Sequence, residues 1–226
     1  MRRSYVVSLA LLAIVKSPAV AQTCMGMASF SNAPVQVAGN GQFTTGVNSF
    51  GGSVGYGMKS GLWGKAEVGT QSYDAVDTHP MTFGARAGYQ IPVARGKAQV
   101  CPTASFTMAN GPDFTNENNS IQDATLGLSV GTVLGANPKM KIVPTAGLSY
   151  AHDRLSSKDS TGTSLGDAAT QSYGLASLGL GLVLNDNISV RPSVEIPLGL
   201  EGSNDARFGL TLGYNFGSSH PAGRRH

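Results

Sequence analysis

Residues 206–216 limit the possible folds of this chain more than any other stretch. An apolar set occupies every second position, and the set between consists of small or polar residues: Phe208, Leu210, Leu212, Tyr214 and Phe216 against Arg207, Gly209, Thr211, Gly213 and Asn215. Successive side chains of a β-strand point to opposite faces, so one face is wholly apolar. Aromatic residues at both ends of that face, with leucines between them, follow the order of a membrane cross-section. The stretch therefore predicts a β-strand that crosses a membrane.

The N-terminus predicts export from the cytoplasm. Two arginines precede an apolar core at residues 5–15, and an Ala-Val-Ala run follows at residues 19–21. This order is typical of a secretory signal peptide, so we expect residues 1–21 to be removed and the mature chain to begin at Gln22. No later run of about 18 apolar residues exists, so the sequence offers no membrane-spanning helix.

The composition agrees with a wall of half-apolar strands. Charged residues make up 13% of the chain, and its 30 glycines are about twice the usual share of ~7%. The formal net charge of +3 is mild, so we infer no nucleic-acid partner. Removing 21 residues from 226 leaves 205, which is enough for one domain.

Eight further runs alternate in the same way, at residues 43–58, 62–73, 81–91, 98–108, 124–134, 140–150, 174–184 and 188–198. Short connections (59–61, 93–97, 136–139 and 185–187) contrast with two long polar ones at residues 109–120 and 153–169. Outer-membrane barrels have short periplasmic turns and longer external loops. With the N-terminus also in the periplasm, one more strand must come first, and residues 27–38 are the only candidate although Pro34 interrupts them. The sequence thus predicts about ten strands, with eight as the nearest alternative.

We therefore predict an all-β fold, a closed antiparallel up-and-down transmembrane β-barrel over residues 22–216, followed by a disordered periplasmic tail at residues 217–226. Loop length sets the orientation of the strands in the membrane, and this orientation divides the aromatic residues between the two membrane interfaces. Phe50, Phe83, Phe106, Tyr150 and Phe208 fall at the outer ends of their strands, and Tyr56, Tyr89, Tyr214 and Phe216 at the inner ends. Both membrane interfaces would then carry aromatic rings, as expected for such a barrel.

The chain resembles the small outer-membrane β-barrel superfamily, the OmpA/OmpX-like barrel domains. The last strand carries the sharpest likeness, because it is similar to the β-signal read by the outer-membrane insertion machinery: Arg207, Gly209, Leu212 and Tyr214, with Phe216 two residues further on. The resemblance implies a location in the outer membrane of a Gram-negative-type bacterium, with outer-membrane lipid and the insertion machinery as partners. The resemblance says less about activity, because members of the superfamily are passive wall proteins, small pores, adhesins and, rarely, lipid enzymes.

Seven charged residues are expected to point into the lumen: Lys65, Glu67, Arg86, Lys141, Arg191, Glu195 and Arg207. Folding the hairpins about their central residues places Glu67 opposite Arg86 and Glu195 opposite Arg207, and such pairs stabilise a sheet by roughly 0.2–1 kcal/mol. Small barrels fill their interiors with side chains, so a polar filling is favoured over a selectivity ring or proton path. Inward glycines leave room for a few waters in a narrow lumen.

The two cysteines are expected to form a disulfide. Cys24 lies just before the first strand, and Cys101 lies near the periplasmic start of its strand on the inward side. Both are thus placed at one mouth of the barrel, and the periplasm is oxidising. A bond between them would tie the N-terminal segment to the inner wall and contribute about 2–4 kcal/mol.

A catalytic role is not expected. Ser149, His152 and Asp153 cluster at the outer end of one strand, where outer-membrane lipid hydrolases use Ser/His pairs, but Ser149 and His152 fall on opposite faces. We therefore assign no catalytic residue, no metal ligand and no cofactor. The leading hypothesis is a non-enzymatic outer-membrane barrel with a structural or surface-contact role through residues 109–120 and 153–169. A narrow channel or small-ligand-binding barrel is the alternative, and a lipid-active enzyme is the third.

Overall fold

The computed structural model describes residues 23–30, 33–74, 78–94, 97–111, 117–134, 137, 139–159, 161–199 and 205–216. These residues form a short 3-10 helix, η1 (Thr23–Met25), and eleven strands: β1 (Val35–Thr44), β2 (Val47–Gly57), β3 (Leu62–Tyr73), β4 (Met81–Tyr89), β5 (Ile91–Val93), β6 (Ala98–Asn110), β7 (Glu117–Thr132), β8 (Met140–Asp159), β9 (Ala169–Leu184), β10 (Ile188–Leu198) and β11 (Arg207–Phe216). The expected signal peptide and the expected tail lie outside the described residues.

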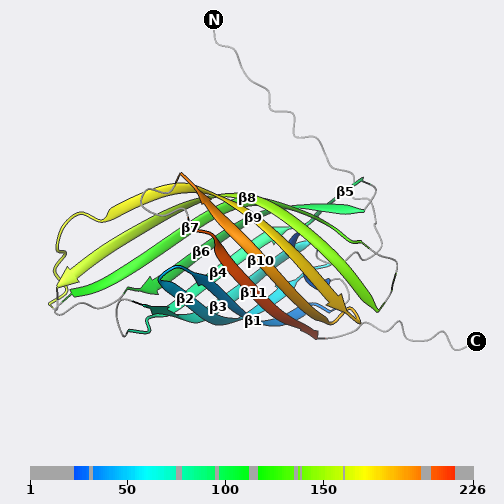
Figure 1. Ribbon diagram of the computed structural model, residues 1–226, viewed down its shortest axis with the longest axis horizontal. Coiled ribbons are helices and arrows are strands. Elements are labelled where there is room, and N and C mark those ends of the chain that lie inside the picture. The colour runs from blue at the N-terminus through cyan, green and yellow to red at the C-terminus, as the bar shows by residue number, and fades with distance from the viewer. Residues whose placement is uncertain are drawn as a thin grey trace, which may run out of the picture.

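The strands close into one antiparallel barrel (Figure 1). The first strand pairs with the last, β1 with β11, and β4 pairs directly with β6. The short β5 follows β4 after Gln90 and pairs with β6 in the same register. Since β4 and β5 act as one interrupted wall strand, the wall has ten strands. The predicted closed, ten-stranded antiparallel barrel is confirmed.

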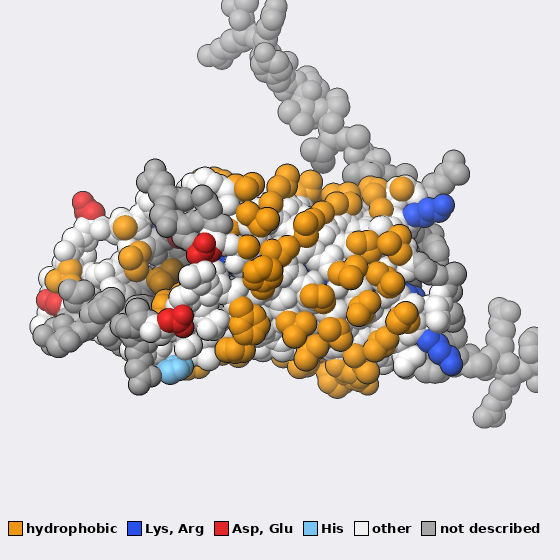
Figure 2. Space-filling view, viewed as in Figure 1, with side chains coloured by type: hydrophobic (Ala, Val, Ile, Leu, Met, Phe, Trp, Pro, Cys, Tyr) orange, Lys and Arg blue, Asp and Glu red, His pale blue; other side chains and the backbone are white. Residues whose placement is uncertain are grey.

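Side chains alternate between an exposed outer face and a shielded inner face. On β4, exposed Met81, Phe83 and Ala85 alternate with less exposed residues such as Arg86. Figure 2 shows apolar side chains gathered in a broad band on the visible face, with acidic groups beyond one edge and Lys or Arg beyond the other. No helix within the described ranges is long and apolar enough to cross a membrane.

The position predicted for the first strand is wrong. The wall begins with Val35–Thr44, and only the last four residues of the predicted segment 27–38 belong to it. Met27, Ala28 and Phe30 are instead buried. Their side chains lie inside one end of the barrel, where they contact inward-facing wall residues, so their apolar character reflects packing in the lumen and not contact with lipid.

The two long connections are shorter than predicted. β7 already begins at Glu117, and β8 continues to Asp159 before β9 starts at Ala169. The extra residues pair across the sheet, for example Asp153 with Gln171. They are polar on both faces, so no apolar alternation marks them as strand. The β8–β9 hairpin therefore extends the wall beyond the apolar band.

Six of the described buried apolar residues form two small clusters inside the barrel. Ala28 packs with Val143 and Val183, with Val133 against them, at the end that holds the N-terminal segment. Ala151, Tyr173 and Leu175 form the second cluster in the opposite half. The remaining large apolar side chains are mostly exposed on the outer face, the reverse of a water-soluble fold.

Candidate functional site

The lumen charges lie on the inward-facing side of their strands, each beside at least one exposed outward neighbour. Lys141 differs from the other six because it lies at the end of the barrel. Its Nζ donates to Oδ1 of Asp186 in the β9–β10 turn at 2.5 Å. The other six, Lys65, Glu67, Arg86, Arg191, Glu195 and Arg207, line the lumen itself.

One of the two expected charge pairs is wrong. Arg86 stands directly opposite Lys65, while Glu67 stands opposite Gly84. Glu67 forms its ion pair with Lys65, two residues along the same strand. The hairpin register is shifted by two residues from the expected one, a shift that keeps every side chain on its face. The second pairing, Glu195 opposite Arg207, is found as expected.

A polar cluster lines the mouth at the β8–β9 end. The hydroxyl of Tyr173 donates to Asp153 Oδ2 at 3.1 Å and accepts from Arg207 Nη2 at 3.4 Å. The Arg207 guanidinium also lies 5.9 Å from the centre of the Tyr173 ring. Asp123 stands directly opposite Asp153, and two carboxylates in this position repel each other unless they share a proton or a cation. The sequence did not predict a role for Tyr173, because alternation indicates only that its side chain faces inward.

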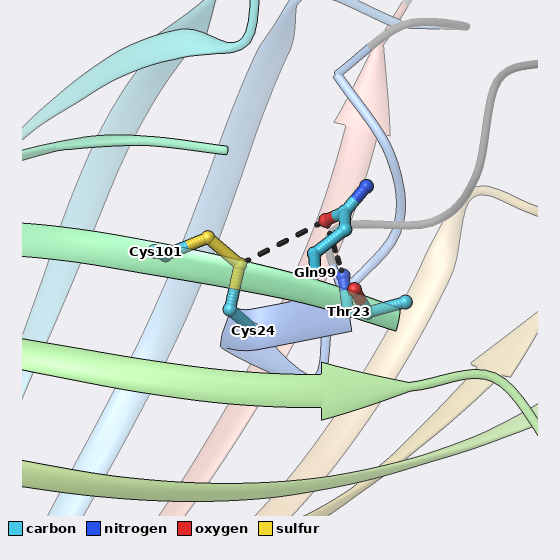
Figure 3. Close-up of a disulfide and its surroundings, with 4 residues drawn as sticks. All are labelled: Thr23, Cys24, Gln99 and Cys101. Carbon is cyan, nitrogen blue, oxygen red and sulfur yellow. Dashed lines mark hydrogen bonds between the residues drawn. A yellow bond between two sulfur atoms is a disulfide. The ribbon is translucent and has the colours of Figure 1, made fainter. Parts of the chain in front are cut away.

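The opposite end of the lumen contains the N-terminal segment, which we call the plug (described residues 23–30, 33 and 34). A disulfide joins Cys24 of η1 to Cys101 of β6, with the two Cα atoms 6.0 Å apart, as Figure 3 shows. Gln99 Oε1 accepts a hydrogen bond from the Thr23 backbone N–H at 3.2 Å. The same oxygen lies 3.7 Å from Cys24 Sγ, a contact that is not a hydrogen bond because a disulfide sulfur has no proton to donate.

Polar side chains of the wall also hold the plug. Asn215, which is 0% exposed, accepts a hydrogen bond from Gln36 Nε2 at 2.7 Å. Its own amide points to the backbone carbonyls of Ala28, Ser29 and Ala33 at 3.4–3.5 Å. An inward polar side chain of β11, itself held by Gln36 of β1, thus donates to backbone carbonyls of the plug.

Inward glycines make room for the plug. A methyl group added to Gly131 of β7 or Gly181 of β9 would lie 1.8 Å from the Thr23 carbonyl oxygen or 2.0 Å from that of Gly26. On β2 and β11, methyl groups on Gly57 and Gly213 would lie 2.2 Å from the Phe30 ring and 2.5 Å from Met27 Cε. The expected use of inward glycines, space for water, is therefore wrong at this end, because chain atoms fill that space.

The Ser149–His152 pair is not assembled. Ser149 is on the inward side, where its Oγ lies against Gly127. His152 is exposed on the outer face, and its Nδ1 forms a 2.8 Å hydrogen bond with Ser172 Oγ of β9. Among the described residues no group of three His, Cys, Asp or Glu side chains could hold a metal ion.

The β-signal residues occupy the last wall strand. Leu212, Tyr214 and Phe216 are exposed on the outer face, and the Tyr214 and Phe216 rings pack edge to face with centroids 4.9 Å apart. Arg207 and Gly209 face inward, where Gly209 stands opposite Ser193. The strand has partners on both sides, β10 and β1.

No protein-family model and no curated protein sequence matches the chain. Solved structures with a similar barrel include the N-terminal β-barrel domain of Pseudomonas aeruginosa OprF, with 17% identity and a TM-score of 0.37 over 82% of this chain and 98% of that chain. The β domain of the Bordetella autotransporter BrkA has 13% identity and a TM-score of 0.48 over 82% and 99%. Ail, the attachment invasion locus protein of Yersinia pestis, has 14% identity and a TM-score of 0.36 over 81% and 99%. These similarities are distant and assign no role to this chain.

Proposed function

We propose that this chain is an integral outer-membrane β-barrel protein of a Gram-negative-type bacterium, closed at its periplasmic end by its own plug. Its role is structural or one of surface contact, and its lumen is not an open pore. The burial of the plug among wall residues is the observation that carries this proposal.

The distribution of apolar surface supports the membrane location. Leu126 and Leu148 are 66% and 65% exposed on the outer face, which would be unfavourable for side chains of this size in water. The aromatic residues Phe106 and Tyr56 are exposed at opposite ends of their strands. Strands of nine or more residues, such as β4 (Met81–Tyr89), are long enough to cross a bilayer when tilted.

The plug supports a closed lumen. Thr23, Cys24, Met27, Ala28 and Phe30 are all at most 5% exposed. Together with Gly26, these residues contact glycines on four separate wall strands. A segment held by a disulfide and by fitted contacts around the wall blocks the passage of solutes. In this orientation the plug and the short turns face the periplasm, and the β8–β9 hairpin extends outward.

Planar-bilayer recordings of the oxidised protein test closure. The proposal expects no steady current of porin size. Such a current from oxidised protein would refute it. A steady current that appears only after reduction of the disulfide would favour the second candidate, a narrow channel controlled by the plug, for which the continuous polar inward face is the supporting observation.

Surface contact is assigned to the external segments at residues 109–120 and 153–169, which include the outer ends of β6, β7, β8 and β9. Cells that carry a chain shortened in the β8–β9 hairpin should lose adhesion while the barrel still folds, which heat-dependent gel migration would verify. Unchanged adhesion would contradict a surface-contact role, and only the structural role would remain. No catalytic step is proposed, since Ser149 and His152 face opposite sides of the wall.

Recognition by the insertion machinery is proposed through Tyr214 and Phe216 at the end of β11. Replacing Phe216 with Ser should reduce the amount of folded barrel in the membrane without changing the stability of the purified, refolded protein. If the purified variant also refolded less well in vitro, to the same extent, the Phe216 side chain would act through packing in the barrel and not through recognition.

A further inference from the structure

Three inward-facing cations lie within electrostatic range of one another in the lumen. Lys65 on β3 and Arg86 on β4 are direct cross-strand partners. Arg191 on β10 is close enough to Lys65 for its charge to act on it. Like charges directly opposite each other destabilise a strand pair. We call these three residues the lumen cation cluster, and strand pairing alone gives no reason for them.

The described carboxylates neutralise the lumen cation cluster only in part. Glu67 forms an ion pair with Lys65. Glu195 acts on Arg191 but stands directly opposite a further cation, Arg207. Within the described part of the chain, the two arginines of the cluster form no ion pair. An excess of positive charge therefore remains in an enclosed space, where its electrostatic effect is stronger than in water.

Three N–H donors in the same region have no hydrogen-bond partner in the described ranges of the chain. The Nε1 of Trp63 and the Nε atoms of Arg86 and Arg191 are buried with no hydrogen-bond partner among the described residues. Trp63 is 2% exposed and packs against Gly88 of β4, its cross-strand partner. It lies two residues from Lys65 on the same face. N–H groups cannot accept hydrogen bonds from one another, so these three atoms cannot satisfy each other and a bound acceptor would satisfy them.

The plug lies directly against this region. A methyl group on Gly26 would lie 3.0 Å from Arg191 Cδ, and one on Gly55, beside Lys65, would lie 3.3 Å from the Phe30 ring. The plug therefore packs against the wall beside the lumen cation cluster.

We propose that the lumen cation cluster binds a small oxyanion with the charge and size of inorganic phosphate or sulfate, directly above the plug. Guanidinium groups present planar forks of N–H donors that match the oxygens of such anions. One oxyanion supplies negative charge and several acceptors together, whereas a water molecule supplies acceptors without charge. This site goes beyond the proposed function, and its test does not depend on the membrane location.

Trp63 provides the readout, because it is the only tryptophan of the chain. Sodium sulfate and sodium phosphate are titrated into the folded, oxidised protein in detergent, with sodium chloride at equal ionic strength as the reference. We expect a saturable change in Trp63 fluorescence with the oxyanions that chloride does not produce. A response that is the same in all three salts, or no response, overturns the proposal.

Two variants separate this site from general charge effects. Arg86→Gln removes one cation of the cluster, whereas Lys141→Gln removes a cation at the barrel end that is already paired with Asp186. Loss of a charged hydrogen bond should weaken oxyanion binding by at least about tenfold in Arg86→Gln, with no change in Lys141→Gln. An equal effect of both substitutions contradicts the site.

A ligand-stability measurement covers the case in which Arg86→Gln does not fold. A ligand that binds only the folded state raises the unfolding midpoint. Sulfate should therefore raise the thermal midpoint of the unaltered protein more than chloride does at equal ionic strength. Equal midpoints in the two salts would overturn the proposal independently of the variants.

Discussion

Replacing Gly181 with Ala would test the fit between the plug and the wall. The added methyl carbon would lie 2.0 Å from the carbonyl oxygen of Gly26 and 2.7 Å from its Cα atom. Non-bonded heavy atoms keep about 3.5 Å apart, so the plug backbone must move by roughly 1.5 Å. The disulfide at Cys24, two residues away, restricts that movement. Overpacking of this kind typically costs about 1–3 kcal/mol.

The matched control is Gly39→Ala, because its added methyl group would meet only one atom, at 3.9 Å. Both substitutions replace a wall glycine with alanine, so they share the change in backbone flexibility. Urea unfolding of the oxidised protein in lipid gives the free energy of unfolding, and gel migration verifies that each barrel forms. We expect Gly181→Ala to be less stable than Gly39→Ala by about 1–3 kcal/mol. Equal stability of the two variants would show that the plug does not occupy the space beside Gly181.

Three other predictions concern the wall, the disulfide and the β8–β9 turn. Leu210→Arg should lower the stability of the membrane-inserted barrel by about 2–4 kcal/mol, because the side chain would face lipid. Thr211→Arg faces inward and should act only by crowding, so its effect on unfolding should not depend on bilayer thickness. Cys24→Ser should lower the free energy of unfolding by about 2–4 kcal/mol. An unchanged unfolding midpoint would show that the disulfide does not stabilise the barrel. The pKa of Asp159 lies below its usual value because the Thr161 hydroxyl and nearby backbone N–H groups donate to the carboxylate. The stabilisation of the turn is fully present above the ordinary aspartate pKa and is lost as the pH falls through the lowered pKa of Asp159. Amide hydrogen exchange in the turn should therefore accelerate only in acid. An exchange profile that does not depend on pH, after correction for intrinsic exchange rates, would contradict this prediction.

The barrel could be predicted from the sequence because alternation survives in every wall strand. The same periodicity explains the error at Glu67 and Arg86. The assumed centre of their hairpin lies one residue from the centre that the observed pairing gives, which shifts the register by two residues. A register shift of two residues leaves every side chain on its original face. Alternation therefore assigns the inward charges to the lumen but cannot say which of them meet.

The plug could not be predicted because its composition resembles that of a wall strand. Met27, Ala28 and Phe30 are apolar in either setting, and sequence alone does not distinguish lipid from a packed lumen. The wall, rather than the plug, carries a sequence signal for this contact. Glycines such as Gly131 and Gly181 fall on inward positions near the end of the barrel where Cys101 lies. The outer half of the β8–β9 hairpin escaped prediction for the opposite reason, since polar residues occupy both of its faces.

Lipid contact of the outer face can be measured directly with single spin labels. The only two cysteines are paired in the disulfide, so an introduced cysteine can be labelled selectively in the oxidised protein. Leu178 and Leu212 are 57% and 53% exposed within the apolar band, and Leu165 is 51% exposed in the β8–β9 turn. Labels at residues 178 and 212 should be accessible to oxygen dissolved in the bilayer and protected from a water-soluble nickel reagent, whereas the label at residue 165 should show the reverse. Protection of residues 178 and 212 from both reagents would mean that these leucines pack inside a protein core, and the account of a lipid-facing wall would be wrong.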